Sequence, residues 1–207
     1  MPRLETDLHL KMLEQGKRKY KDRPIYGLHW GDPEVHGVLA NVRDRWIVPY
    51  VDAEKTCVEI GVGGGRWTRY LTGFKKVYAV DYHEEMFAEL KKTVDAPNIE
   101  YVKNNGDDFP GVAPGSVDYL FTFGTFVHID LDIIERYLEN IRKILKPDAR
   151  AFIQYSDKTK ERAKQNEHFS INTPGIMVPL VESKGFKVLE EERENLKNAS
   201  CIFIKPV

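Results

Sequence analysis

The sequence predicts an α/β domain built on a mainly parallel sheet of seven strands. Three observations carry this prediction. Strand-like apolar runs alternate with helical segments from residue 56 onward, the first run passes into a glycine-rich turn, and only a short polar link separates the last two runs. A link that short allows a hairpin but no parallel crossover, so we expect one antiparallel strand near an edge and helices on both faces.

The strands and helices are expected in a regular order along the chain. Strands are expected over residues 57–62, 76–82, 99–102, 117–123, 151–155, 186–190 and 200–204. Helices are expected to begin at Trp67 and to cover residues 84–94, 131–145 and 176–184. Pro147 should end the long helix before it, and Gly185 should close the last one.

The first fifty-odd residues are interpreted as a helical cap. We place this cap at residues 1–54 and the main unit at residues 55–207, within one structural domain overall. Residues 4–15 are amphipathic, and residues 38–48 have helical spacing. The side chains expected to face inward from the second of these helices are Val38, Val42, Trp46 and Ile47.

Composition narrows the class of protein and its partners. The chain has 207 residues, 42% of them hydrophobic, and a net charge of -1. A near-neutral chain lacks the basic field that long nucleic acids require, so no nucleic-acid partner is expected. No apolar run is long enough to cross a bilayer, and the first residues lack the apolar core of a secretory signal, so we expect a cytoplasmic protein without membrane contact. Cys57 and Cys201 lie in apolar runs, which predicts buried, reduced thiols.

The strongest functional motif is the glycine-rich turn after the first strand. Residues 61–65 contain four glycines, which allow positive φ and let a ligand approach the backbone closely. A dinucleotide fingerprint needs a further glycine where this chain has Arg66. The spacing is instead Gly-x-Gly-x-Gly, with Glu59 just ahead of it. A nicotinamide-dependent oxidoreductase is therefore the weaker alternative.

Two further acidic positions fit a nucleoside ligand. Asp81 closes the second strand, twenty residues after Gly61, where an acid can accept both ribose hydroxyls. Its structural alternative is a helix N-cap. Asp107 follows Asn105 and Gly106 in a segment that would form a turn in any case.

Together these motifs resemble the class I S-adenosylmethionine-dependent methyltransferases, which have a Rossmann-like fold, over about residues 56–155. The resemblance implies S-adenosylmethionine as the cofactor. It also implies that Glu59 orders the loop and the methionine amino group, that Asp81 holds the ribose, and that Asp107 accepts from the adenine amino group. The implied cofactor-binding residues are Glu59, Gly61, Gly63, Gly65, Asp81, Tyr82, Asp107, Asp108 and Phe123. Histidine and cysteine show no metal-ligand spacing, and no metal is expected.

The expected acceptor site follows the fourth strand, at residues 123–130, beside the sulfonium. This stretch lacks the Asn/Asp-Pro-Pro-Tyr/Phe motif of enzymes that methylate amino groups of bases or glutamine. The chain is similar to a subgroup of small methyltransferases that act on sugars, polysaccharide ends or natural-product hydroxyls. The similarity implies O-methylation of a small-molecule or glycan acceptor; a cofactor-binding protein without catalysis is the non-enzyme alternative.

His128 is the candidate general base, because imidazole titrates near neutrality. The alternative for His128 is a structural role at the start of the following helix. Asp157 follows the fifth strand and is expected either to orient His128 or to bind substrate. Residues 26–32 mix aromatic, glycine and polar residues, and they fit a lid over the site and an N-terminal brace equally well.

Overall fold

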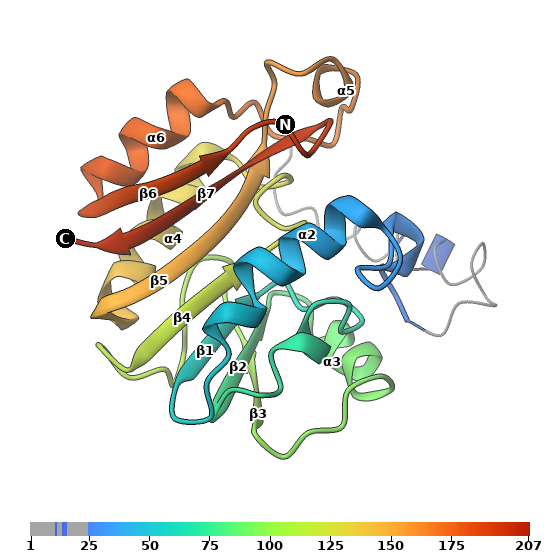
Figure 1. The fold of residues 1–207 in the computed structure, drawn as a ribbon, viewed down its shortest axis with the longest axis vertical. Helices are drawn as coiled ribbons and strands as arrows, with labels where there is room; N and C mark the ends of the chain where they lie inside the picture. The colour runs from blue at the N-terminus through green and yellow to red at the C-terminus, as the bar shows by residue number, and fades with distance from the viewer. Residues whose placement is uncertain (1–10, 12–13, 16–24) are drawn as a thin grey trace.

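The computed structural model describes residues 11, 14–15 and 25–207, and it contains one seven-stranded sheet in the order β3-β2-β1-β4-β5-β7-β6 (Figure 1). The strands are β1 (Thr56–Ile60), β2 (Lys76–Asp81), β3 (Ile99–Lys103), β4 (Val117–Thr122), β5 (Leu145–Ser156), β6 (Phe186–Glu192) and β7 (Ala199–Pro206). The amphipathic helix expected over residues 4–15 lies almost entirely outside the described residues.

The neighbours of β1, β2 and β4 are all parallel, and only β7 runs against its two neighbours β5 and β6. Six residues, 193–198, join β6 to β7, which is too short for a parallel crossover. The fold class expected from the sequence is therefore confirmed, with its antiparallel strand one place in from the edge.

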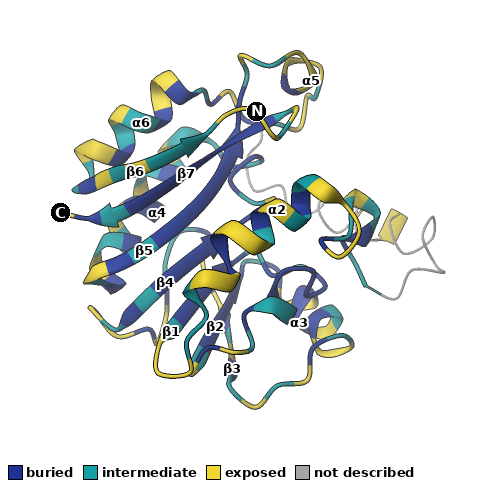
Figure 2. Cartoon of the chain, viewed as in Figure 1, coloured by how far each residue is buried: buried dark blue, intermediate teal, exposed yellow. Residues whose placement is uncertain are grey.

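Helices cover both faces of the sheet (Figure 1). The helices are α2 (Gly37–Trp46), α3 (Glu84–Lys91), α4 (Leu131–Ile144), α5 (Glu161–Lys164) and α6 (Pro174–Ser183), with 3₁₀ turns η1 (Leu28–Trp30), η2 (Val48–Tyr50) and η3 (Thr68–Tyr70). One apolar core joins α4 and α6 to one face, and a second joins α2, η3 and α3 to the other. Figure 2 shows the strands mostly buried between them. No helix among the described residues has the length and apolarity that a membrane crossing requires.

The cysteine prediction is confirmed. Cys57 in β1 and Cys201 in β7 are buried, and both are free thiols. Burial raises the pKa of Cys57 and of Cys201, because the thiolate loses its hydration inside the core. Both thiols are therefore packing groups of the core.

Helix α2 covers the centre of the sheet, but its inner face differs by one position from the expected one. Leu39, Val42 and Trp46 are buried, whereas Val38 is half-buried. The Trp46 ring lies 5.4 Å from the Phe152 ring on β5. The helical period that runs back from Trp46 and Val42 reaches Leu39 three residues earlier, which leaves Val38 to the side.

The helix expected to begin at Trp67 is replaced by the single turn η3, so that expectation is wrong. Successive three-residue hydrogen bonds run from Tyr70 N to Trp67 O and from Phe74 N to Leu71 O. These tight turns bury Trp67, Leu71 and Phe74 in one core. Gly73 then passes so close to Val51 that a Cβ would stand 2.6 Å from its side chain, and the chain enters β2 without a longer helix.

The end of α4 also differs slightly from the expected boundary. The helix ends at Ile144, and Leu145 is already the first residue of β5. Pro147 restricts Lys146 to extended backbone, which stops the helix as expected. The chain turns directly into the strand, with a register shift against β4 instead of a loop.

Candidate active site

The carboxyl ends of β1, β2 and β4 open into a cavity of about 730 Å³. Ile60 and Asp81, which end β1 and β2, line it, as do Phe123 and Gly124 just beyond β4. Ligand sites of parallel α/β sheets lie at these strand ends, and small-molecule sites occupy about 300–1,000 Å³. The cavity therefore has the place and size of a ligand site.

The glycine-rich loop forms one wall of the cavity and is packed tightly from behind. A Cβ on Gly61, whose φ is +79°, would stand 1.8 Å from Thr125 Oγ1. A Cβ on Gly64 would stand 2.7 Å from the backbone nitrogen and oxygen of Tyr26. The loop thus needs glycine partly because two other segments press against it.

Two of the three expected loop glycines line the cavity, namely Gly61 and Gly63. Gly65 does not line it. A Cβ at Gly65 would stand 2.7 Å from Thr93 Oγ1 and 2.8 Å from Leu90 Cδ1, so Gly65 faces α3 and its C-terminal end. It lets the helix pack against the loop.

Glu59 lies at the base of the loop and is 2% exposed. Its Oε2 accepts a hydrogen bond of 2.6 Å from Thr68 Oγ1, which ties β1 to η3. Burial raises the pKa of Glu59 to about 8, because the carboxylate is costly to hold away from water. Glu59 therefore joins the strand before the glycine-rich loop to the turn after it.

Asp81 lies at the carboxyl end of β2, lines the cavity and is 8% exposed. Its Oδ1 accepts a hydrogen bond of 2.9 Å from the backbone N–H of His83, and the backbone N–H groups of Gly63 and Val62 also point at the carboxylate. Burial raises the pKa of Asp81 to about 6 despite these donors. Tyr82, the next residue, lines the cavity as well.

Asp107 and Asp108 have partners outside the cavity lining. Asp107 Oδ2 pairs with Arg136 Nε at 2.5 Å, and its carbonyl accepts from Asn140 Nδ2. Asp108 accepts from the backbone N–H and the side-chain amide of Asn105, both at 2.7 Å. Neither side chain lines the cavity, and the adenine role of Asp107 stays a prediction.

The segment after β4 supplies the opposite wall. Thr125 Oγ1 donates to Ile60 O at 3.2 Å, which fixes this segment to the end of β1. The Gly124 N–H donates to Gln154 Oε1 at 2.6 Å, which fixes it to β5. Phe123 lines the cavity as expected.

His128 lies further along the same wall and lines the cavity. Its Nδ1 is 2.9 Å from the carbonyl oxygen of His168, and its ring meets the edge of Phe169 at 5.2 Å. The loop after α5 therefore fixes the orientation of the imidazole.

Asp157 is buried just beyond β5 and does not line the cavity. Its carboxylate accepts from Thr159 Oγ1 at 2.6 Å and from Ser200 Oγ at 2.7 Å. Burial acts to raise the pKa of Asp157, but the hydrogen bonds from Thr159 and Ser200 outweigh it and hold the pKa below its usual range. The structure brings the Asp157 carboxylate to these two hydroxyls, and its expected role beside His128 or the substrate stays a prediction.

Sequence reasoning missed one residue near the glycine loop. Arg66 was noted only as the place where a glycine is absent, yet it is 9% exposed and lines the cavity. Its Nη1 donates to the carbonyl oxygens of Gly27 at 3.2 Å and Gly31 at 3.5 Å. A charged residue directly after a glycine-rich loop was the available signal.

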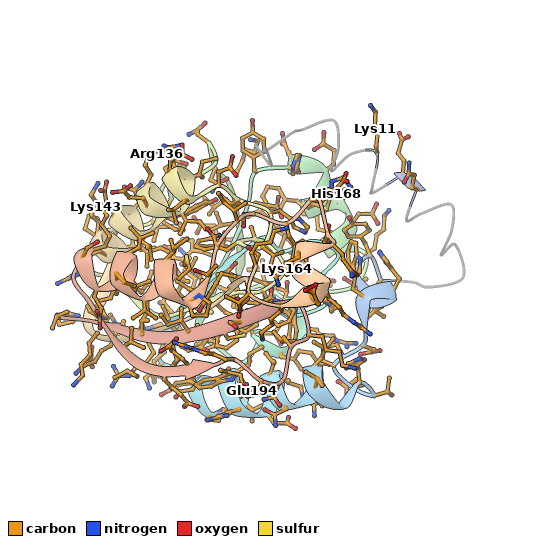
Figure 3. All side chains as sticks on the ribbon, turned by 90° about the horizontal axis from the view of Figure 1, so that it is seen from above. Lys11, Arg136, Lys143, Lys164, His168 and Glu194 are labelled. Atoms are coloured by element: carbon orange, nitrogen blue, oxygen red, sulfur yellow. The ribbon has the colours of Figure 1, made fainter. Side chains whose placement is uncertain are left out.

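Sequence reasoning also missed most of the far end of the cavity. Its lining there includes Arg162, Asn166, His168, Asn195, Lys197 and Asn198. Figure 3 labels His168 on the loop after α5 and Lys164 on α5 itself. These residues come from α5, the loop behind it and the link between β6 and β7, and nothing in their local sequence predicts that they meet.

The comparisons with known proteins agree with this architecture. Residues 57–148 match a family model described as a methyltransferase domain, from β1 into the first part of β5. No curated protein sequence matches the chain. Among solved structures, an S-adenosylmethionine-dependent methyltransferase from Aquifex aeolicus is 23% identical, with 85% of this chain and 99% of that chain covered and a TM-score of 0.62.

Two more solved structures share the fold at lower identity. A TehB-like S-adenosylmethionine-dependent methyltransferase from Corynebacterium glutamicum is 16% identical, with 95% of this chain and 99% of that chain covered and a TM-score of 0.68. The DhpI-SAH complex is 17% identical, with 95% and 94% covered and a TM-score of 0.68. The match to a methyltransferase domain favours a methyltransferase over the alternative of a nicotinamide-dependent oxidoreductase. The methyltransferase-domain match and the shared Rossmann-like fold therefore support an enzyme of this kind, with S-adenosylmethionine as its cofactor.

Proposed function

We propose that the enzyme methylates a hydroxyl oxygen of a small acceptor, such as a sugar, a polysaccharide end or a natural product. The observation that carries this proposal is the orientation of His128 at the acceptor end of the cavity. A hydroxyl is a weak nucleophile while it keeps its proton, so it gains more than an amine from a nearby base.

The cofactor supplies a methyl group that is already activated for in-line displacement. The proposal places the ribose hydroxyls on the Asp81 carboxylate, with Tyr82 and Gly63 beside them in the wall. Glu59 holds the loop on which the methionine part lies, through its hydrogen bond to Thr68. Alignment of this kind can supply about 7–11 kcal/mol of the barrier, so the chain's main task is positioning.

His128 has the tautomer that a base requires. The His168 carbonyl can only accept a hydrogen bond, so Nδ1 of His128 must carry the hydrogen in that contact. A neutral imidazole protonated on Nδ1 has its lone pair on Nε2. In the proposed reaction, Nε2 of the neutral imidazole is the atom that takes the proton of the acceptor hydroxyl.

The lining of the acceptor end suits a polar molecule. Its amide side chains, Asn166, Asn195 and Asn198, offer both donors and acceptors to hydroxyl groups. Asp81 is the one carboxylate among the described lining residues, and in this scheme it accepts hydrogen bonds from the ribose hydroxyls. Arg162 and Lys197 make this end positive, which favours acceptors that carry a carboxylate or phosphate beside their hydroxyls.

Asp157 has a structural task in this proposal. Its carboxylate joins the chain after β5 to Ser200 on β7 and fixes the turn at Thr159. It thereby holds the base of the segment that carries α5 and His168. It does not exchange a proton with the acceptor.

The test is methyl transfer from labelled S-adenosylmethionine to a panel of acceptors. The panel should hold neutral sugars, acidic sugars and hydroxylated aromatic metabolites, with amino sugars and nucleobases as nitrogen acceptors. We expect a methyl ether, identified by mass spectrometry and NMR of the product. A product methylated on nitrogen by a wild-type enzyme that ignores the hydroxylated acceptors would contradict the proposal.

A further inference from the structure

Arg66 is a buried cation, and the carboxylates of Glu59 and Asp32 lie near enough to act on its charge without forming an ion pair with it. It is 9% exposed, and its guanidinium carbon lies 5.5 Å and 5.6 Å from the ring centres of Trp67 and Phe123. Among the described residues it forms no ion pair. The two nearby carboxylates have other partners, since Asp32 pairs with Arg69 and Glu59 accepts from Thr68. Burying a charge without an ion-pair partner costs free energy, and an ionic ligand bound beside the charge would offset that cost.

The donors of Arg66 divide between the protein and the cavity. Nη1 donates to the carbonyl oxygens of Gly27 and Gly31, which holds the segment before α2. Nη2 lies 3.8 Å from the point where a Cβ on Gly124 would stand, beside the end of β4. The hydrogen bonds of Arg66 to the described part of the chain both come from Nη1, so Nη2 and Nε are left on a residue that lines the cavity. A fork of N–H donors is left for a ligand that carries a planar anion.

The order of the strands decides which part of the cofactor reaches this fork. Asp81 ends β2, the glycine loop follows β1, and Gly124 follows β4, in the sheet order β2-β1-β4. A cofactor with its ribose on Asp81 that crosses the glycine loop therefore points its amino-acid end toward β4. The step from β2 to β4 is two strand spacings, roughly 10 Å, which an extended methionine chain spans.

We propose that Arg66 binds the carboxylate of the methionine part of S-adenosylmethionine. The carboxylate of the ligand then becomes the ion-pair partner of the guanidinium. Through Nη1, the same guanidinium connects the bound cofactor to the segment that contains Gly27 and Gly31. This role concerns the established cofactor and stands apart from the proposed acceptor. Burial lowers the pKa of Arg66 to about 10, which still leaves it charged at neutral pH.

The experiment compares two cofactors that differ only in this carboxylate. Calorimetry should measure binding of S-adenosylmethionine and of decarboxylated S-adenosylmethionine to wild type, Arg66→Gln and Arg66→Lys. A charge-assisted hydrogen-bond pair corresponds to roughly 10- to 100-fold in affinity, so wild type should prefer the carboxylated cofactor by that factor. Arg66→Gln should lose the preference by weakening S-adenosylmethionine alone, and Arg66→Lys should keep part of it.

A matched control separates binding of the carboxylate from bracing of the chain. Arg69 pairs with Asp32 on the segment that Arg66 holds, but it does not line the cavity. Arg69→Gln should leave the ratio of the two affinities unchanged. If Arg66→Gln weakens both cofactors equally, Arg66 is only a brace and the proposal is wrong. A ratio near one in wild type overturns it as well, whether or not the variants fold.

Discussion

The two ends of the cavity are built in different ways. At the cofactor end, Glu59 and Asp81 are buried, and backbone N–H groups or a hydroxyl already hold their carboxylates. At the acceptor end, Arg162, His168 and Lys197 are exposed and come from separate segments. The side chains of the cofactor end are held in place before a ligand binds. Those of the acceptor end can be replaced without disturbing the sheet. In our proposal, buried residues therefore bind the cofactor and exposed residues bind the acceptor.

The largest effect should come from removing the base at the acceptor end. His128→Ala should lower kcat by about 10²–10⁴ because an acceptor hydroxyl then keeps its proton longer. Cofactor affinity, measured by calorimetry, should stay nearly unchanged. His168→Ala is the matched control: it removes an acceptor-end side chain but keeps the backbone carbonyl that holds His128, so it should alter KM more than kcat. Loss of turnover and of cofactor affinity in step would mean that His128 is structural.

The next largest effect should come from the cofactor end. Asp81→Ala should weaken S-adenosylhomocysteine by at least about tenfold, because the ribose loses a charged acceptor. The pKa of Asp81 is raised to about 6, so wild-type affinity should fall as the pH drops below that value and the carboxylate takes up a proton. Asp81→Asn should not show this fall. If folded Asp81→Ala binds S-adenosylhomocysteine as tightly as wild type does, Asp81 only supports the loop and does not bind the ribose.

Glu59 should reveal itself in the pH dependence of stability. Burial raises the pKa of Glu59 from 4.5 to about 8, so the folded state binds more protons than the unfolded state between these values. The contribution of Glu59 to the free energy of unfolding is therefore greatest below pH 4.5 and declines as the pH rises toward 8. The slope is at most about 1.4 kcal/mol per pH unit for one proton.

Glu59→Gln should remove that slope and keep an oxygen for the hydroxyl of Thr68. In urea unfolding without cofactor, Glu59→Gln should gain stability relative to wild type as the pH is raised from 4.5 to 8. A constant difference between the two proteins over this range would show that Glu59 is not buried as a protonated acid.

The smallest effect should come from the exposed cations of the acceptor end. Replacing Arg162 and Lys197 together by alanine should raise KM for an acidic acceptor about 2- to 10-fold, since each exposed charge contributes only about 0.2–1 kcal/mol. Affinity for the cofactor should not change. Lys164→Ala is the control, because Lys164 lies on α5, pairs with Glu161 and does not line the cavity. An equal rise of KM in Lys164→Ala would show that the effect comes from the net charge of the protein and not from residues that line the cavity.

The sequence predicts the cofactor end well because its residues are neighbours in the chain. Glu59 and the loop glycines occupy seven consecutive positions, and the turn they form follows from local backbone freedom. The short turn η3 in place of a helix was not predictable in this way. The turn is followed by a close approach of Gly73 to Val51, a contact between distant positions that local periodicity does not contain.

At the proposed acceptor end, the sequence singles out only His128, six positions beyond the end of β4. Arg162 and Lys197 are 35 positions apart, and a hydrogen-bonded lysine, Lys160, joins their segments by donating to the carbonyls of Leu196 and Ala199. Contacts of this length depend on the folded sheet. The contact of Asp157 with Ser200 on β7 is of the same kind, because the two residues are 43 positions apart in the chain.

The position of Trp30 allows ligand binding to be measured by the intrinsic tryptophan fluorescence of the enzyme. Of the three tryptophans of the chain, Trp46 and Trp67 are 4% and 3% exposed, whereas Trp30 is 51% exposed and lines the cavity. Its ring lies 5.5 Å from that of Tyr26, the residue that presses on the glycine loop. Emission at the longest wavelengths therefore comes mainly from Trp30, and occupation of the cavity will change its intensity and colour. Ligands can be followed in real time through this emission without an attached dye.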